Sequence, residues 1–526
     1  MQQSDALKSH SWWSATASMP VYPPLSANLN VEACVIGGGI AGVTTAYLLA
    51  QTGLSVALIE ALSIGDGETS RTTAHIAPPD EGYAALESRH GLETARMVAD
   101  SFRAALELIE RNVQTEHIAC DLERLDGYLF SCGTSPHVAL DRELAAARRA
   151  GVEAFKEDTL PLAPSVAGPP VLRFPGQGQF HPLRYLAGLA KAITRKRGVI
   201  YCGTRGLEIE ERHGHALVTT PTGRIIADHV VVATNTPFSE RVAMHTKQNA
   251  YQTYVVAAHL RKGSTPRALL WDDADPYHYV RTTPGADELH DLLIVGGADH
   301  RTGQEPCPER RYQELEQWMR GRFPQAGPLA YRWSGEVMEP LDGLAYLGRS
   351  SGNEHVYLIT GDSGNGITYA TIGAMLVTDL ILGRPNSWVS LYDPSRKTYR
   401  EAVQFLKEQA NIVKQYTDYV LPGADIDVAT LAPGDGALLR SGMGKVAVYR
   451  DELGALHWHS ASCTHLGCIV QWNSAEKTWD CPCHGSRYSA YGSVLHGPAV
   501  HNLEPIDPDH WRKLLKAGKT GQTPPR

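Results

Sequence analysis

Residues 31–60, VEACVIGGGIAGVTTAYLLAQTGLSVALIE, constrain the fold more than any other stretch of the chain. An apolar run leads into a glycine-rich turn, a helical pattern follows, and a second apolar run ends the segment. This order opens a doubly wound α/β fold that places a pyrophosphate at the helix N-terminus. Gly37 permits the tight turn, Gly39 lets the backbone approach the phosphates, and Gly42 lets the helix pack closely on the strand.

Glu60 completes this pattern, because an acid at the end of the second strand can bind a ribose hydroxyl. The alternative is a glycine-rich turn without a ligand. A second G-x-G-x-x-G in a strand–helix context is not found in the sequence, so a separate NAD(P)H site is not supported. The predicted dinucleotide contacts are Gly37, Gly39, Ile40, Ala41, Gly42 and Glu60.

Four later blocks favour FAD as the dinucleotide. They are GDGETSRTTAHIAPP (65–79), ADHVVVATN (227–235), YRWSGEVMEPLDGLAYLG (331–348) and VYLITGDSGNGITYATIGAMLVTDLILG (356–383). With the first motif, they resemble the D-amino-acid oxidase superfamily of FAD enzymes, which includes glycine oxidase and sarcosine oxidase. The resemblance covers residues 30–390 in separate blocks.

This resemblance implies that further residues contact FAD, with the G-N-G-I-T turn at the flavin end. Thr72 falls where some relatives attach FAD to a histidine, so we expect noncovalent FAD, although His75 leaves the other option open. The implied contacts are Ser70, Arg71, Thr72, Thr73, Ala233, Thr234, Asn235, Gly361, Gly364, Asn365, Gly366, Ile367 and Thr368.

The resemblance also implies an amine or amino-acid substrate that is oxidised to an imine by hydride transfer to FAD. No strong base is then required, and the protein mainly orients the substrate. Arg281 stands on an expected strand where relatives often bind a carboxylate. Surface ion pairs for the arginines and a plain loop position for His300 are the alternatives. The candidate catalytic residues are Arg281, His300, Tyr331 and Arg332.

A second signature lies near the C-terminus, CTHLGCIVQWNSAEKTWDCPCHGSRY, residues 463–488. Each of two loops supplies one cysteine and one histidine, Cys463 with His465 and Cys481 with His484. Zinc also accepts two cysteines and two histidines, but zinc fingers usually pair like with like. One thiolate pair and one imidazole pair are what a Rieske [2Fe–2S] cluster requires.

The stretches CTHLGC and CPCHGS resemble the Rieske motif almost position for position. The resemblance to the high-potential Rieske proteins of respiratory and photosynthetic cytochrome complexes implies a Cys468–Cys483 disulfide. It also implies that the hydroxyls of Ser486 and Tyr488 bond the cluster's sulfurs and raise its potential. Two free buried thiols are the alternative, and a disulfide would be unusual in the cytoplasm.

The expected fold is an α/β Rossmann-like FAD-binding fold with an inserted β-rich substrate domain, followed by an all-β Rieske domain. The helical linker is amphipathic and charged, and the tail is expected to be disordered. The predicted parts are an N-terminal extension (1–29), a discontinuous FAD-binding domain (30–238 and 331–390), a substrate-binding sheet (239–330), a helical linker (391–416), the Rieske domain (417–510) and a tail (511–526).

Bulk properties narrow the function classes. The formal net charge of −8 argues against nucleic-acid binding, which requires a basic surface. No apolar run reaches the length of about 18 residues that spans a bilayer. The N-terminal residues lack a secretory signal pattern, so we expect a cytoplasmic protein.

We therefore expect an FAD-dependent amine or amino-acid dehydrogenase that passes electrons one at a time through the Rieske cluster to an external acceptor. That acceptor could be a protein, a quinone or oxygen. The alternatives are an electron-transfer protein that serves a partner oxygenase and a redox sensor built on the disulfide. A self-contained Rieske oxygenase is disfavoured, because little chain follows His484 to hold a mononuclear iron.

Overall fold

The computed structural model describes residues 10–132, 136–158, 160, 170–212, 214–239, 244–396, 428–441 and 444–508. Among them, a first compact unit takes in those of 1–239, 252–299 and 311–398, and a second takes in those of 240–251, 300–310 and 399–526. Most of the predicted linker and the whole predicted tail lie outside the described residues. The domain boundaries stay predictions.

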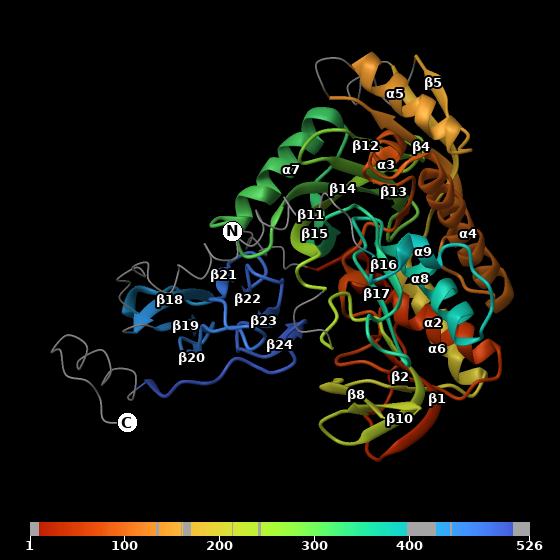
Figure 1. Cartoon of the computed structure of the whole chain (residues 1–526). Coiled ribbons are helices and arrows are strands. Elements are labelled where there is room, and N and C mark those ends of the chain that lie inside the picture. Colours follow the sequence, from red (N-terminus) through yellow and green to blue (C-terminus); the bar gives the residue numbers. More distant parts are fainter. Residues whose placement is uncertain are drawn as a thin grey trace. The chain divides into compact units, whose positions relative to one another are not determined.

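The first unit contains an eight-stranded sheet whose central strands are parallel (Figure 1). Its strands are β1 (Leu29–Ile36), β2 (Val56–Ile59), β7 (Val199–Tyr201), β8 (Glu208–Arg212), β9 (His215–Thr219), β10 (Arg224–Val232), β16 (Tyr346–Arg349) and β17 (Val356–Thr360). The order is β16-β17-β10-β1-β2-β7, and β9 pairs β10 and β8. Strands β2 and β17 are buried throughout, as expected for a parallel sheet covered on both faces.

Helices cover this sheet and the connections between its strands. Helix α2 follows the glycine turn, is buried along most of its length and packs against α6 and α8 (Figure 1). Helix α6 starts with a proline in its first turn, where the missing N–H costs nothing. The helices are α1 (Trp12–Thr16), α2 (Ile40–Gln51), α3 (Gly82–His90), α4 (Leu92–Glu116), α5 (Pro136–Arg149), α6 (Pro182–Arg195), α7 (Pro308–Arg322), α8 (Gly366–Ile381), α9 (Val389–Tyr392) and the 3₁₀ turn η1 (Glu68–Ser70).

A second, nine-stranded sheet confirms the predicted β-rich insertion. Its strands are β3 (His75–Ile76), β4 (Glu123–Phe130), β5 (Phe155–Glu157), β6 (Val171–Gln179), β11 (Gln248–Arg261), β12 (Leu269–Asp272), β13 (His278–Pro284), β14 (His290–Arg301) and β15 (Leu329–Pro340). The order is β15-β11-β14-β13-β12-β4-β6-β3, with β5 beside β6. The sheet thus also takes in strands from outside residues 239–330.

The second unit contains two small antiparallel sheets, which confirms the predicted all-β C-terminal fold. Their strands are β18 (Asp435–Ser441), β19 (Gly444–Arg450), β20 (Leu456–Ser460), β21 (Gln471–Asn473), β22 (Thr478–Asp480), β23 (Arg487–Ser489) and β24 (Val494–His496), with a 3₁₀ turn η2 (Val428–Thr430). The sheet orders are β18-β19-β20 and β21-β22-β23-β24. Trp479 and Tyr488 are fully buried in the core between the loops that carry the Cys/His motif.

Within the part of the chain that the structure describes, no helix is both long enough and apolar enough to cross a bilayer. The cytoplasmic location stays a prediction of the sequence.

Candidate functional site

Four segments predicted to contact the dinucleotide meet at one edge of the eight-stranded sheet. Strands β1, β2, β10 and β17 run parallel, and in their register Ile36 lies beside both Ile59 and Val232. The glycine turn, Glu60, the 233–235 turn and the 361–368 turn follow these strands directly. Between β1 and β10 the order of the strands changes direction, and such a switch point is where open α/β sheets bind nucleotides.

The glycine turn forms a cradle that side chains would fill. Gly37 has a φ of +116°, and a Cβ there would lie 2.3 Å from the Ala233 carbonyl oxygen. A Cβ on Gly42 would lie 1.9 Å from the Gly37 carbonyl oxygen. Gly39 then caps α2 with its backbone alone. The residues therefore fit a dinucleotide whose phosphates approach the backbone at a helix N-terminus.

Glu60 lies against this turn, and its contact with a ribose hydroxyl stays a prediction. Its carboxylate accepts hydrogen bonds from the N–H of Gly38 at 2.5 Å and from the N–H of Leu62 at 2.7 Å. Burial raises the pKa of Glu60. Thr69, which the sequence did not single out, accepts a hydrogen bond from the Ile40 N–H through its hydroxyl at 3.0 Å.

The predicted loop at 70–73 is anchored by tryptophans. The Trp13 indole donates to the Thr72 carbonyl at 2.6 Å, and the Trp333 indole donates to the Arg71 carbonyl at 2.8 Å. The Arg71 guanidinium donates to the Ser334 carbonyl at 2.7 Å. The two indole groups thus hold the loop in one conformation, and the Arg71 side chain ties it to the backbone of Ser334.

Arg281 binds backbone rather than presenting a free guanidinium. Its Nη1 donates to the carbonyls of Thr73, Ala74 and Phe180 at 2.8–3.2 Å, and its side chain is 1% exposed. Burial lowers its pKa to about 9. These contacts give no support to the prediction that Arg281 binds a substrate carboxylate.

His75 lies beside Thr73, and both of its ring nitrogens have partners. Nδ1 lies 3.0 Å from the Thr73 hydroxyl, and Nε2 lies 3.1 Å from the Val280 carbonyl. Burial lowers its pKa to about 3, so the ring is neutral. Noncovalent FAD stays a prediction.

The late glycine turn opens α8 and contacts the 233–235 turn. The Thr360 hydroxyl donates to the Asn235 carbonyl at 2.5 Å, and Asn235 has a φ of +62°. Asn365 accepts the Asp80 N–H at 3.0 Å and donates to the Asp80 carboxylate at 3.3 Å. Ile367 and Thr368 are buried behind the turn.

Four carboxyl groups gather around this turn, and sequence reasoning missed them. Tyr277 donates to Asp80 at 3.1 Å, and a Cβ on Gly364 would lie 2.0 Å from the same carboxylate. Ser363 donates to Glu339 at 2.8 Å. The four acids come from one loop, two strands and the turn itself, and they are Asp80, Asp299, Glu339 and Asp362. We call them the acid group.

Burial raises the pKa of every member of the acid group, and repulsion from other members adds to the rise for Asp80 and Glu339. The Asp80 side chain is partly exposed to solvent, but the protein packed around it raises its pKa to about 7. Repulsion from Asp299 and Asp362 adds to this rise. Burial likewise raises the pKa of Glu339 to about 8. The pKa values of Asp299 and Asp362 rise to about 6 for the same first reason. Carboxyls with such values are typical of a functional site.

The other three predicted catalytic residues contact neighbouring rings and backbone. Tyr331 packs edge-on against Trp12 at 5.4 Å, and Arg332 lies over the ring of Tyr312 at 4.9 Å. His300 belongs to the second unit, where its Nδ1 lies 2.8 Å from the Arg301 carbonyl. Their roles in substrate oxidation stay predictions.

In the second unit, two tight turns present the predicted cluster ligands. Cys463 and His465 lie between β20 and β21, and Cys481 and His484 lie between β22 and β23. Gly467 N–H donates to the Cys463 carbonyl at 2.9 Å and closes the first turn. The rings of His465 and His484 are perpendicular with centroids 5.0 Å apart.

The donor set fits an iron–sulfur cluster. The pKa of Cys463 is lowered to about 6, first by the Cys481 thiol and then by Tyr488, whose Oη lies 3.2 Å from Cys463 Sγ. Burial and the neighbouring His465 lower the pKa of His484 to about 4, which keeps that imidazole neutral. The same hydrogen bond with Cys463, together with burial, raises the pKa of Cys481, so one thiol of the pair ionises first. Thiolates and neutral imidazoles are the forms that bind metal.

The disulfide between Cys468 and Cys483 is present, as predicted from the resemblance, and joins the two ligand loops. Cys481 Sγ lies within 4.8 Å of both disulfide sulfurs. Ser486 is fully buried, and its hydroxyl accepts the Ala499 N–H at 3.1 Å.

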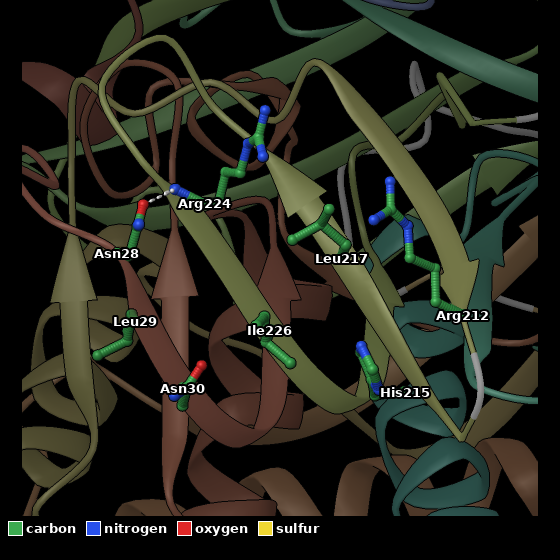
Figure 2. Close-up of a pocket in the computed structure, with 8 residues that line it drawn as sticks. All are labelled: Asn28, Leu29, Asn30, Arg212, His215, Leu217, Arg224 and Ile226. Carbon is green, nitrogen blue, oxygen red and sulfur yellow. Dashed lines mark hydrogen bonds between the residues drawn. The ribbon is translucent and has the colours of Figure 1, made fainter.

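A pocket of about 270 Å³ lies at the other end of β1 (Figure 2). Asn28 and Asn30 line it at the start of β1, whereas the glycine turn follows the end of that strand. Arg212, His215 and Arg224 from β8, β9 and β10 complete its polar lining. The pocket is therefore separate from the dinucleotide cradle.

Comparisons with known proteins agree with both sites. The family model "FAD dependent oxidoreductase" (DAO) matches residues 32–380, and the Rieske [2Fe-2S] domain model matches residues 424–507. The putative Rieske 2Fe-2S iron-sulfur protein YhfW of Bacillus subtilis (strain 168) is 30% identical over 503 residues, which is 95% of this chain and 97% of that protein.

Two further relatives cover the first part of the chain. Gamma-glutamylputrescine oxidoreductase of Escherichia coli (strain K12) is 25% identical over 394 residues, 71% of this chain and 89% of that enzyme. The crystal structure of glycine oxidase from Geobacillus kaustophilus shares the fold, with a TM-score of 0.59 at 18% identity over 70% of this chain and 100% of that one.

The two family models together match most of the chain, and each contains one of the two sites described above, the glycine cradle and the paired Cys/His loops. The cofactors of the chain are FAD and a [2Fe–2S] cluster. The chain belongs to the DAO family of FAD-dependent oxidoreductases and carries a C-terminal Rieske [2Fe–2S] domain.

Proposed function

We propose that this protein oxidises a cationic amine at a carbon–nitrogen bond and passes the electrons through the Rieske cluster to an external acceptor. The observation that carries the proposal is the acid group around the 361–368 turn, which the family resemblance assigns to the flavin end of FAD. The likeness to gamma-glutamylputrescine oxidoreductase supports an amine substrate.

The acid group favours a positive charge. Asp80, Glu339 and their neighbours repel one another when ionised, and a bound ammonium relieves that repulsion. By contrast, the buried guanidinium of Arg281 is occupied by backbone carbonyls. The site therefore suits an amine better than an amino acid, whose carboxylate would meet further negative charge.

Asp80 is also placed to remove a proton from the bound amine. A hydride leaves readily only from the carbon beside a neutral nitrogen, so the ammonium must first lose a proton. A carboxylate with a pKa of about 7 is well matched to that task near neutral pH. The Tyr277 hydroxyl and the Asn365 amide hydrogen-bond the Asp80 carboxylate and hold it in place.

FAD, when bound, supplies two-electron acceptance from carbon, and the cluster supplies one-electron transfer. The protein has to bind both cofactors within one chain and keep water away from the substrate carbon that is oxidised. Tyr277 and Tyr279 pack with ring centroids 5.4 Å apart, and the Tyr277 hydroxyl bonds Asp80, so we assign to these rings the role of limiting water around that carboxylate.

The experiment compares matched substrates anaerobically on the purified protein. Cadaverine and lysine share one carbon skeleton and differ by a carboxylate, so the pair isolates the effect of the negative charge. We expect the diamine to bleach the visible flavin absorbance and to produce the EPR signal of the reduced cluster, with lysine much slower. A series of secondary amines and longer polyamines then ranks chain length.

Two outcomes would contradict the proposal. Faster bleaching by amino acids than by their decarboxylated partners would exclude the role given to the acid group. Failure of every amine, with both cofactors reducible by dithionite, would favour the alternative of an electron-transfer protein that receives electrons from a partner.

A further inference from the structure

Two segments of the oxidoreductase sequence belong to the compact unit of the Rieske domain. They are residues 244–251 and His300–Arg310, and both lie within the match to the DAO family. Thr302 N–H donates to the Ala250 carbonyl at 3.0 Å, and the Arg301 guanidinium lies over the Tyr251 ring at 5.7 Å. The two segments thus form one small structure beside the cluster loops.

His245, in the first segment, contacts both histidine ligands of the cluster. Its ring centroid lies 4.7 Å from that of His465 and 5.6 Å from that of His484, with interplanar angles of 72° and 63°. Only 4% of the His245 side chain is exposed. Edge-to-face contacts of this kind fix the relative orientation of rings. One imidazole therefore orients the two that hold the cluster.

The second segment contacts the other ligand loop. Gln304 donates through Nε2 to the Pro482 carbonyl at 3.4 Å. Gly303 has a φ of +69°, and a Cβ there would lie 3.0 Å from the Asp480 carbonyl oxygen and the Pro482 nitrogen. A side chain at this position would clash with that backbone, so the close approach requires glycine. The first segment thus contacts the two histidine ligands, and the second contacts the backbone on either side of Cys481.

We infer that His245 is a positioning residue that holds His465 and His484 in the orientation in which they bind the Rieske cluster, and that this orientation sets how fast the cluster accepts electrons. The thiolate side is enclosed, because Cys463 and Cys481 are 4% and 1% exposed. His484 and His245 are likewise only 8% and 4% exposed, so both ligand pairs lie inside the second unit.

The inference rests on the proposed electron route and extends it. Each passage takes one electron from reduced FAD and reduces the cluster by one electron. An external one-electron acceptor must reoxidise the cluster before the second electron follows, and the protons released by FAD pass to solvent.

The test uses the full-length holoprotein and does not depend on the substrate. Photoreduction with deazaflavin reduces the FAD, and stopped-flow absorbance with freeze-quench EPR times the arrival of electrons at the cluster. We expect His245→Ala to slow this transfer by about tenfold or more, as loss of a positioning contact does. Flavin photoreduction should be unchanged. His457→Ala is the matched control, because His457 lies on β20 with its Nε2 on Asp451.

Two readouts are independent of turnover. Diethyl pyrocarbonate labelling with peptide mapping should find His465 and His484 protected in the wild type and modified in His245→Ala. The g values of the reduced cluster should shift in His245→Ala and return toward wild type in His245→Phe, which keeps the ring contact. The phenylalanine variant should also restore most of the transfer rate.

Wild-type transfer in His245→Ala, with ligand protection unchanged, would overturn the inference. Should His245→Ala fail to assemble the cluster, His245→Phe and His245→Asn decide: a faster Phe variant supports the inference, and equal rates overturn it. Failure of every amine to reduce the flavin would sink the proposed substrate class and leave this test intact.

Discussion

Replacing Tyr488 with phenylalanine tests how the protein sets the potential of its cluster. The Tyr488 Oη lies 3.2 Å from Cys463 Sγ and accepts the Thr464 N–H at 3.1 Å, and the side chain is fully buried. Phenylalanine keeps the ring in its core position and removes the hydroxyl. Reduction adds negative charge to the cluster and its thiolates, so a hydrogen bond to sulfur stabilises the reduced state more than the oxidised state.

The magnitude follows from the energy of one such bond. A hydrogen bond to a charged group contributes about 1.5–3 kcal/mol, and a large part of it is present in both oxidation states. If about 1 kcal/mol differs between the states, the potential falls by about 40 mV, since a tenfold change in a one-electron equilibrium is about 59 mV. We therefore expect Tyr488→Phe to lower the midpoint potential by about 40 mV.

The assay is a redox titration of the full-length protein, monitored by the EPR signal of the reduced cluster. Tyr449→Phe is the control, because Tyr449 is a buried tyrosine of the same core whose ring packs against Trp472. An unchanged or raised potential in Tyr488→Phe would refute the reasoning. So would an equal fall in the control, because the effect would then come from packing.

Three further changes test the remaining parts of the structure. Asp80→Asn should weaken amine-driven flavin reduction and remove its rise with pH through about 7, where the wild-type carboxyl ionises; pH–rate profiles of the two proteins check this. The folded pKa of Asp80 lies above its unfolded value of about 3.9, so the wild type loses stability as pH rises from about 3.9 to about 7. In urea titrations, Asp80→Asn should therefore be more stable than the wild type above about pH 8 and equally stable at low pH. Replacing Cys468 and Cys483 together by serine should lower the free energy of unfolding of the Rieske domain by about 3 kcal/mol, the entropic contribution expected for a cross-link across a separation of 15 residues. Calorimetry would measure this fall, and finding no fall would mean that the cluster alone holds the two loops together. Gly42→Ala should abolish FAD retention on purification, because its Cβ would lie 1.9 Å from the Gly37 carbonyl oxygen, and a variant that still binds FAD would disprove the cradle.

Short-range patterns made both cofactor sites predictable. The glycine turn needs residues without side chains at set spacings, and Glu60 needs one strand to bring it back, so a single supersecondary unit contains the whole signal. The cluster ligands likewise lie in two loops with characteristic spacing, Cys463 with His465 and Cys481 with His484. The chemistry of a site that is built from local sequence can be recognised before the fold is known.

The acid group shows what the tertiary structure decided. Asp80 and Glu339 stand far apart in the sequence, and in isolation each resembles an ordinary solvated acid. Only the folding of the first unit brings them around one turn and raises their pKa values. Arg281 shows the converse, because only the fold buries its side chain and brings its Nη1 to three carbonyls, contacts that give no support to its predicted role at the substrate.

The sequence by itself determined which cofactors this chain holds and predicted which residues hold the cluster, because covalent spacing places those groups. The tertiary structure alone decided the grouping of the four acids and the contact of His245 with His465 and His484. Both depend on strand pairing between distant segments and on how much solvent that pairing removes. Neither quantity is written in any short stretch of the chain.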